Sequence, residues 1–423
     1  MRTNVVSISL AFLIFCLAAG HPAEAQKIEL DSVIQKFDNY RKRTLQEKIY
    51  LHTDRNFYLV GETMWFKVSC VDATFHRPLD VSKVVYVEVL DHTNKAVQQA
   101  KIRIDGGSGH GSMFLPASLA TGNYTVRAYT RWMQNFDAAF FFHQSITIAN
   151  TLSSPEAAIS NATSTLDIQF FPEGGNLVAG LESKVAFKVS DAQNKGVDFT
   201  GVVINDKGES VATFRPLKFG MGHFIFTPVA NTKYSAVIVD SKGLRHNAPF
   251  PAINERGWVM RLQENHTAVE ISVQANTSEG LIYFFVQTRH RRIKAEAKLI
   301  GREPQTFTVS KSELPDGISH FTFFNSRLEP MCERLFFKTP HQQLLPSISG
   351  VPTTIGTRQK ISLSIGTNVP ADLSVAVTRK DSLSLTAPPS ILENLFLTSD
   401  LRGVIESPSY YFSNTDTLVS AAT

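Results

Sequence analysis

A chain of 423 residues is too long for one β-sandwich, and its length predicts three or four domains. An apolar share of 43% and a charged share of 19% exclude a largely disordered chain, because such a composition can fill ordinary globular cores. A formal net charge of +4 is small for this length, so it gives no basis for binding nucleic acid or an acidic membrane surface.

Residues 1–25 are predicted to form a signal peptide. Arg2 supplies the positive start, and the apolar run Val5–Ala19 has about the length of a signal-peptide core. Ala23-Glu24-Ala25 then gives a small-x-small cleavage pattern. A lipid anchor at Cys16 is the weaker alternative, because a large residue precedes this cysteine. No other segment is long and apolar enough to span a membrane, so we expect an exported mature protein.

The next two units are a helix over residues 26–44 and a first sandwich over residues 45–150. Apolar residues recur at helical spacing in the first of these, at Leu30, Val33, Ile34 and Phe37. We expect this helix to pack on the first sandwich. In Glu47–Val68, EKIYLHTDRNFYLVGETMWFKV, alternating strands surround turn formers, and Gly122–Thr130, GNYTVRAYT, is a later strand that follows a turn.

The remaining chain divides into a linker and three further units. Residues 151–165 have linker composition, and turn residues break 166–250 and 252–338 into β-prone runs about 8 to 12 residues apart, as in sandwiches. Residues 345–423 are expected to form a fourth, partial and truncated sandwich. It should contain a hairpin between KISLSIG and LSVAVTR, a short helix that includes Ile391 to Phe396, and a final strand at Tyr410–Phe412.

Five residues carry a family resemblance through an early Tyr-x-x-Gly-Glu turn and a late Gly-x-Tyr strand: Tyr58, Gly61, Glu62, Gly122 and Tyr124. This pairing resembles the second macroglobulin-type domain of the alpha-2-macroglobulin superfamily, and it is most similar to the macroglobulin-like proteins of Bacteroidota cell envelopes. The family usually has Pro where this chain has Val60. The phrases FPEGGNLVAG, GMGHFIFTP, ERLFF and LTSDLRGVIESPSYYF extend the resemblance. It implies an all-β fold of tandem Ig-like, macroglobulin-like antiparallel sandwiches, with Tyr58, Gly61 and Tyr124 as fold determinants.

The resemblance also raises the question of covalent peptidase trapping, which in this family needs a thioester in the motif Cys-x-Glu-Gln. Neither Cys70, before Val-Asp-Ala, nor Cys332, before Glu-Arg-Leu, lies in that motif. Covalent trapping by this chain is therefore excluded on chemical grounds. We expect both cysteines to be buried free thiols, and a disulfide joining two domains is the lesser alternative.

Other candidate sites favour structural interpretations. The glycine-rich Gly106–Ser112 lacks the lysine and the helix of a phosphate loop. The basic stretch Arg289–Arg292, with Lys294 and Lys298, could contact an acidic glycan or phosphate but is typical of a solvated hairpin end. Phe140–Phe142 with Trp132 could stack on sugars, although a core or domain-interface position is favoured.

The carboxylates Asp54, Glu62 and Glu173 lie beside turns, and spacing alone does not pair them for acid–base catalysis. The histidines show no metal-binding spacing. We therefore predict no catalytic, cofactor-binding or metal-binding residues and no cofactor.

The function predicted from the sequence is that of an exported, non-enzymatic macroglobulin-like binding or scaffold protein, with non-covalent peptidase recognition or inhibition as its narrower form. One alternative is the periplasmic extension of a TonB-dependent outer-membrane nutrient-uptake system. Another is a set of accessory sandwiches of a glycan-processing enzyme. The expected partners are proteins, either a peptidase or an outer-membrane receptor component. The expected location is periplasmic or outer-membrane-associated, with an extracellular location as the alternative.

Overall fold

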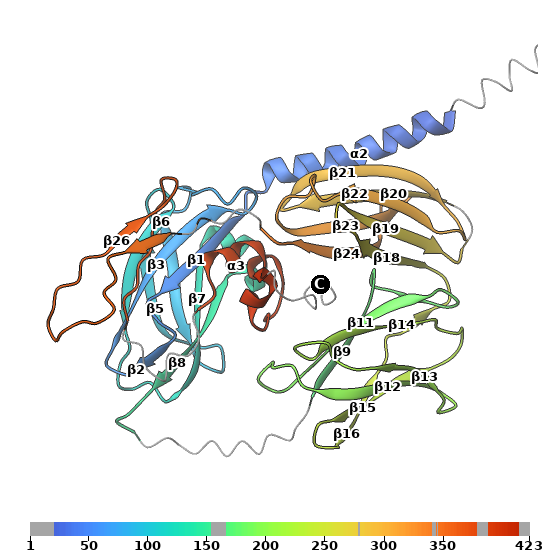
Figure 1. The fold of residues 1–423 in the computed structure, drawn as a ribbon. Coiled ribbons are helices and arrows are strands. Elements are labelled where there is room, and N and C mark those ends of the chain that lie inside the picture. The colour runs from blue at the N-terminus through green and yellow to red at the C-terminus, as the bar shows by residue number, and fades with distance from the viewer. Residues whose placement is uncertain are drawn as a thin grey trace, which may run out of the picture. The chain divides into compact units, whose positions relative to one another are not determined.

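The computed structural model describes residues 21–153, 166–277, 280–340, 344, 346–378 and 388–413, with side chains from residue 30 onward (Figure 1). The predicted signal-peptide core and most of the predicted linker lie outside these residues. The chain splits into two compact units: one holds Met1–Gln46, Ser160–Lys338 and Val404–Thr423, and the other holds Glu47–Ile159 and Thr339–Gly403. Among the described residues, no helix has the length and hydropathy to cross a membrane.

Two sheets form the first sandwich, in the unit that begins at Glu47. The smaller sheet has the order β1 (Glu47–Thr53), β3 (Thr63–Asp72) and β6 (Ser108–Phe114). The larger has the order β2 (Phe57–Leu59), β8 (Phe142–Ala149), β7 (Gly122–Thr130), β4 (Val84–Leu90) and β5 (Ala96–Arg103). Among the described strands of this sandwich, only β2 and β8 pair in parallel. Alternate residues of both sheets fill one core, as the period-2 pattern predicted.

The same unit contains the later segment up to Gly403. There β25 (Ser347–Ser349) pairs with β26 (Ser364–Gly366), and the helix α3 (Ile391–Phe396) contacts β1. The α3 helix was predicted, and it begins with a capping box between Ser390 and Glu393. The predicted hairpin is wrong. Residues 371–378 form no strand, and β26 pairs upstream with β25, because alternation indicates strand capacity but does not choose the partner.

Two further sandwiches make up most of the other unit. In the second, a sheet of β14 (Met221–Phe226), β11 (Ser183–Ser190) and β9 (Asp167–Pro172) faces a sheet of β13 (Ser210–Phe214), β12 (Phe199–Asn205), β15 (Tyr234–Asp240) and β16 (Arg245–Pro249). In the third, β18 (Trp258–Glu264), β19 (Ala268–Ala275) and β22 (Gln305–Ser310) face β21 (Arg291–Ile300), β20 (Gly280–Thr288), β23 (Gly317–Asn325) and β24 (Pro330–Lys338).

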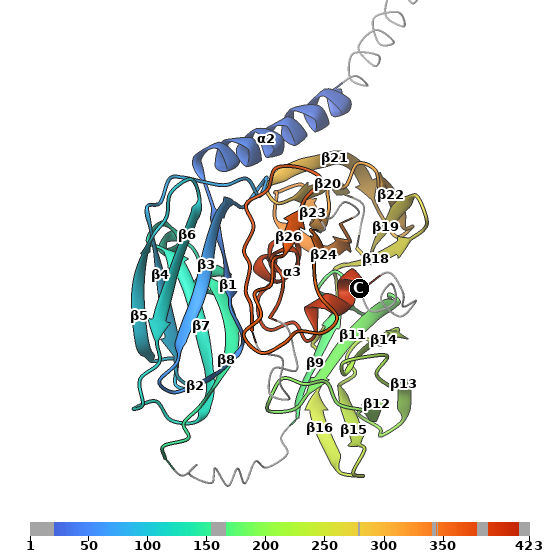
Figure 2. The ribbon, with the colours of Figure 1, turned by 60° about the vertical axis from the view of Figure 1, so that its left-hand side comes forward.

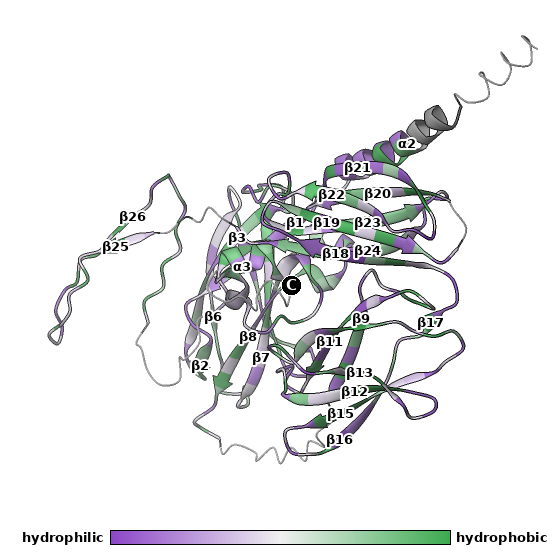
Figure 3. Ribbon diagram, turned by 45° about the vertical axis from the view of Figure 1, so that its right-hand side comes forward, coloured by the Kyte–Doolittle hydropathy of each residue, from purple (hydrophilic) through white to green (hydrophobic). Residues whose placement is uncertain are grey.

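Phenylalanine rings dominate both of these cores. Phe187, Phe214 and Phe224 contact one another in the second sandwich, and Phe284 and Phe323 do so in the third. Apolar and polar residues are interspersed along the strands (Figure 3), as a sheet with one buried face requires. The predicted all-β fold of tandem antiparallel sandwiches with short helical segments is confirmed, and the domain boundaries stay predictions.

The predicted N-terminal helix exists as α2 (His21–Arg43), but its predicted packing partner is wrong. The Phe37 ring lies 4.9 Å from the Phe285 ring, and the Tyr40 ring lies 6.2 Å from the imidazole of His290. The helix therefore lies along β21 on the third sandwich (Figure 2). Helical spacing identified the apolar stripe, but it carries no information about which sheet the stripe covers.

Candidate functional site

The motif FPEGG lies where the second and third sandwiches meet. After β9 ends at Pro172, the carbonyl of Gly174 accepts a hydrogen bond from the N–H of Glu333 on β24, at 3.4 Å. Gly174 has φ of +81°, and a Cβ there would lie 2.8 Å from Cβ of Met260. Only glycine fits this close approach of two sandwiches. The short strands β10 (Leu177–Val178) and β17 (Ile253–Asn254) pair in parallel and extend the junction.

Glu173 is buried at this junction, with a side chain only 5% exposed. Its Oε1 accepts hydrogen bonds from Nε of Arg334 at 3.2 Å and from the N–H of Leu262 at 3.3 Å. Its Oε2 is also buried, but within the described part of the chain no group donates to it. A buried acceptor without a donor is costly, so this oxygen gains most from a ligand that brings one.

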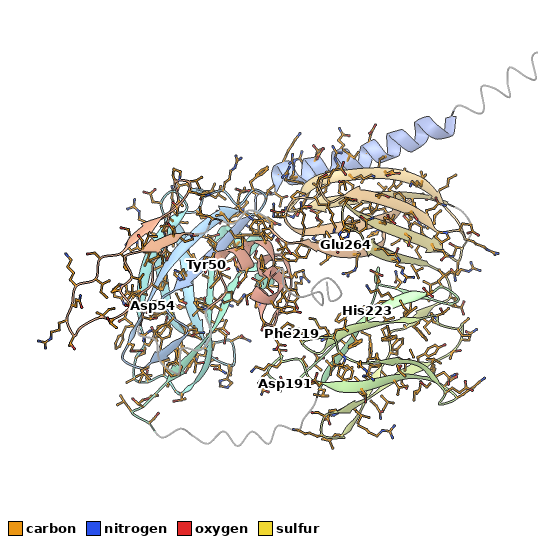
Figure 4. All side chains as sticks on the ribbon, in the orientation of Figure 1. Tyr50, Asp54, Asp191, Phe219, His223 and Glu264 are labelled. Carbon is orange, nitrogen blue, oxygen red and sulfur yellow. The ribbon has the colours of Figure 1, made fainter. Side chains whose placement is uncertain are left out.

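Two clefts open beside Glu173, with volumes of about 550 and 460 Å³. Both are lined by Glu173, Lys184 and Arg334. The larger adds residues of β9 and β24, and the smaller adds the end of β18, including Glu264 (Figure 4). Volumes of this size are typical of binding sites. We name the two together the junction cleft.

The charges of the junction cleft are unevenly matched. Arg334 pairs with Glu173, and Lys311 pairs with Glu264. The side-chain ammonium of the half-buried Lys184 forms no ion pair or hydrogen bond with any described residue. The cleft thus presents one ammonium and one carboxylate oxygen to which no described residue is bonded. The two residues are neighbours, because the N–H of Glu173 donates to the carbonyl of Lys184.

A short C-terminal segment, Val404–Ser413, contacts both sandwiches, and we call it the strap. Its Glu406 accepts a hydrogen bond from the N–H of Gly196 at 2.8 Å, and its Tyr410 ring lies 5.2 Å from Phe219. Its Phe412 ring lies 5.4 Å from Phe337 on β24. The predicted strand here is wrong: η4 (Pro408–Phe412) is a 3-10 helix, in which proline favours the first turn.

The motif turn of the first sandwich is built from local polar bonds. The hydroxyl of the fully buried Tyr58 lies 2.7 Å from Oδ1 of Asp54 and 2.8 Å from the carbonyl of Arg55. Asp54, labelled in Figure 4, also accepts from the N–H of Trp65 at 3.0 Å. Burial, followed by the bond to Asp54, raises the pKa of Tyr58 far above its ordinary value. This hydroxyl therefore stays protonated and serves structure.

Glu62 and Gly61 complete the turn. Oε2 of Glu62 accepts from the N–H of Leu59 at 2.7 Å, and Oε1 lies 3.3 Å from Nη1 of Arg55. Gly61 has φ of +85°, a conformation that favours glycine. At the far end, the hydroxyl of Tyr124 donates to the carbonyl of Ala120 at 2.9 Å, the tie of a corner tyrosine.

Residues 48–141 match the family model described as MG2 domain. We call this sandwich the MG2 domain, after the family that it matches. The match falls on the strands that carry the Tyr-x-x-Gly-Glu turn and the corner tyrosine, so the macroglobulin-type resemblance is confirmed for this part of the chain. No curated protein matches the chain.

Similar solved structures include three bacterial proteins. Escherichia coli alpha-2-macroglobulin activated by porcine elastase is 11% identical, with a TM-score of 0.27, over 76% of this chain and 33% of its own. A Salmonella alpha-2-macroglobulin mutant is 10% identical, with a TM-score of 0.22, over 72% and 24%. Dimeric latent PorU from Porphyromonas gingivalis is 12% identical, with a TM-score of 0.29, over 68% and 33%.

The chain therefore spans about a third or less of the length of these proteins. The assignment of the MG2 domain rests on the family model and on the strands that it covers.

The other stretches singled out in the sequence take structural positions. Ser108–Phe114, after the first two glycines of the glycine-rich stretch, is the strand β6. Arg289 and His290 form the positive-φ turn of a hairpin, and Nη1 of Arg289 donates to the carbonyl of Asp316 at 2.6 Å. Lys294 and Lys298 both pair with Glu296. This stretch is a hairpin end, as predicted.

The remaining aromatic, cysteine and carboxylate candidates also divide between surface and core. Phe142 is buried in the MG2 core, Phe141 stacks on Tyr129, and Phe140 and Trp132 are exposed. Cys70 and Cys332 are buried free thiols in different units. Asp54 and Glu62 both lie within 3.4 Å of the Arg55 guanidinium, and Glu173 lies in the other unit. Among the described residues, no three His, Cys, Asp or Glu side chains gather as a metal site.

Glu173 was predicted only as a carboxylate beside a turn, and Lys184, Arg334 and the strap were not predicted as parts of a site. The sequence offered two indications of this site: the family phrase FPEGG contains Glu173, and the family phrase ERLFF contains Arg334. Their meeting across 161 residues is a tertiary contact that neither phrase encodes.

Proposed function

We propose that this chain is an exported, non-enzymatic binding protein of macroglobulin type. The observation that carries the proposal is the MG2 domain. The residues of its Tyr-x-x-Gly-Glu motif form hydrogen bonds within the turn that they build. The turn is stabilised by bonds of Asp54 and Glu62 to backbone N–H groups and to Arg55, and by the bond between Tyr58 and Asp54. These residues therefore have a structural role in a binding domain. The junction cleft adds a surface at which a partner can bind.

The narrower form of the proposal is non-covalent recognition of a peptidase. The MG2 match supports a macroglobulin-type partner of this kind, and the two buried thiols outside a thioester motif support binding without a covalent bond. Burial raises the pKa of both thiols to about 12, so neither is an effective nucleophile near neutral pH.

A mixture of the purified chain with pancreatic elastase or trypsin tests this proposal. We expect a complex that elutes early in size-exclusion chromatography with light scattering and separates fully in denaturing gels. A peptidase inactivated at its serine should bind equally well. A complex that survives denaturation would contradict non-covalent binding, and the lack of any complex with active or inactivated peptidase would contradict peptidase recognition.

A separate measurement tests the proposal that the chain has no enzymatic activity. The purified chain should not hydrolyse casein, chromogenic peptides or a panel of bacterial and plant glycans. Turnover that follows the chain through two purification steps would overturn the proposal.

A further inference from the structure

Two strand edges to which no described strand is added line the junction cleft. In the sheet orders, β9 and β24 are both terminal strands. The N–H of Glu173 bonds to β11, so strand alternation turns the backbone groups of Ile168 and Phe170 away from β11. The N–H of Glu333 bonds to Gly174, so alternation turns those of Leu335 and Phe337 to that same side of β24.

These edges meet at one end and separate at the other. The Gly174–Glu333 bridge joins them at the end of β9, and the strap contacts Phe337 and Phe219 at the other end. Within the described residues, no strand pairs with either edge between these points. An open edge is a template for another strand, because its N–H and C=O groups lack ladder bonds.

The side chains in the cleft present a matching pair of groups. No described group donates to the buried Oε2 of Glu173, and none accepts from the ammonium of Lys184. A peptide unit offers one N–H and one C=O, so one unit of main chain can satisfy both. The half-exposed Phe171 and the buried Phe336 line the clefts and offer apolar contacts to its side chains.

We propose that the junction cleft binds an extended polypeptide segment by strand addition to β24, with its main chain held by Glu173 and Lys184. This inference rests on the proposed binding role and names its ligand class. Main-chain recognition gives affinity with little sequence preference. The occupant is therefore an unfolded or loop segment of a partner protein and not a folded surface.

Binding of carboxymethylated α-lactalbumin, a permanently unfolded polypeptide, tests the proposal by fluorescence anisotropy with the full chain. Calcium-loaded native α-lactalbumin is the folded control, and a polyproline decapeptide, which lacks N–H donors, is the competitor control. We expect the unfolded probe to bind, the folded probe not to bind, and polyproline not to compete.

Three variants locate the binding. Leu335→Pro removes the outward N–H of β24 and should weaken binding about tenfold, since a backbone hydrogen bond and its neighbour are lost. Asn247→Pro is the matched control, because β16 is also a terminal strand and alternation from the Asp240–Leu244 bond turns Asn247 outward. It should bind like the natural chain. Lys184→Met keeps the aliphatic stem and should weaken binding about fivefold.

Each variant must show the circular dichroism spectrum and melting temperature of the natural chain. If Leu335→Pro misfolds, Lys184→Met still tests the cleft, because Lys184 is only half-buried. The cleft is not the site if Lys184→Met, and Leu335→Pro where it folds, bind the unfolded probe as tightly as the natural chain. It is also not the site if Asn247→Pro loses as much affinity as Leu335→Pro. Such a result would leave the peptidase complex untouched, because that complex is measured separately. No binding of the unfolded probe would overturn the inference.

Discussion

The guanidinium of Arg334 on the third sandwich lies 3.2 Å from the buried carboxylate of Glu173 on the second. Arg334→Met keeps most of the side-chain volume but removes the charge that faces Glu173. We expect a loss of about 3 kcal/mol in unfolding free energy, because an uncompensated carboxylate stays buried. Urea unfolding followed by tryptophan fluorescence measures it.

Arg327→Met is the matched control, since Arg327 pairs with Glu329 at an exposed position, where solvent screens the pair and its loss should change stability little. If both variants lose the same unfolding free energy, the pair of Arg334 and Glu173 stabilises the chain no more than an exposed ion pair does.

The two glycines of FPEGG should differ sharply when replaced by alanine. Both have positive φ, which costs about 1 kcal/mol for any other residue. At Gly174 the new Cβ would also meet Met260 at 2.8 Å and Cys332 at 3.4 Å, whereas nothing lies within 4 Å at Gly175. Gly174→Ala should therefore lower the melting temperature more than Gly175→Ala and speed the reaction of Cys332 with a thiol reagent. Identical labelling rates in the two variants would count against a close junction.

Tyr58→Phe should destabilise the MG2 domain by about 1 to 3 kcal/mol, because Asp54 loses a buried hydroxyl partner. Tyr86→Phe is the control: the Tyr86 ring stacks on Tyr129, and its hydroxyl forms no hydrogen bond with any described residue. Hydrogen exchange of the amides in β2 and β3 reports the change locally. The prediction fails if both variants protect these amides as well as the natural chain does.

The stability of the folded chain should fall as the pH rises above about 9. Burial raises the pKa of Cys332 to about 12, from 9.0 ordinarily, so the unfolded chain releases this proton first. Its contribution to stability is complete below pH 9.0 and is lost as pH rises from there to about 12. Cys70 and Tyr50 act in the same direction, since burial raises both pKa values to about 12. Melting temperatures between pH 8 and 11 should fall less steeply for Cys332→Ala, and parallel curves would contradict the assignment.

Lys48 of the MG2 domain is nearly buried and lies 2.5 Å from Oδ1 of Asp400. Asp400→Ala should cost about 3 to 5 kcal/mol locally, because the ammonium loses its counter-charge. Hydrogen exchange of residues 391–400 should rise strongly. Arg402→Ala, which removes an exposed pair with Asp137, should leave that exchange nearly unchanged. Restoration of protection by the pair Lys48→Met and Asp400→Leu would show that charge compensation is what the site requires.

Tyr58 and Tyr124 were predicted as fold determinants from short motifs, and both hydroxyls bond to near neighbours in the chain. Tyr58 bonds to Asp54, four residues away, and Tyr124 to Ala120 at the same separation, so a short motif specifies the contact. The β-prone runs between turn residues likewise predicted strands in all three sandwiches, whose alternate residues fill the cores.

Pairings between distant segments were not readable. The spacing of Leu30 and Phe37 defines a helix face, but the ring of Phe285 that covers it is chosen by tertiary packing. The run from Lys360 to Gly366 fits a strand in any register, and its neighbour β25 was decided by geometry. Glu173 and Arg334 each sit in a recognisable phrase, yet only the fold brings the phrases together.

The contact between Lys48 and Asp400 spans 352 residues, and this separation sets an order of events during synthesis. At about 5 to 20 residues per second, β1 is made roughly 20 to 70 seconds before the helix that covers it. The strands of the second and third sandwiches are finished at Lys338, before α3 is made. All three sandwiches therefore have their strands before the C-terminal segments that pack on them are made, α3 on the MG2 domain and the strap on the other two.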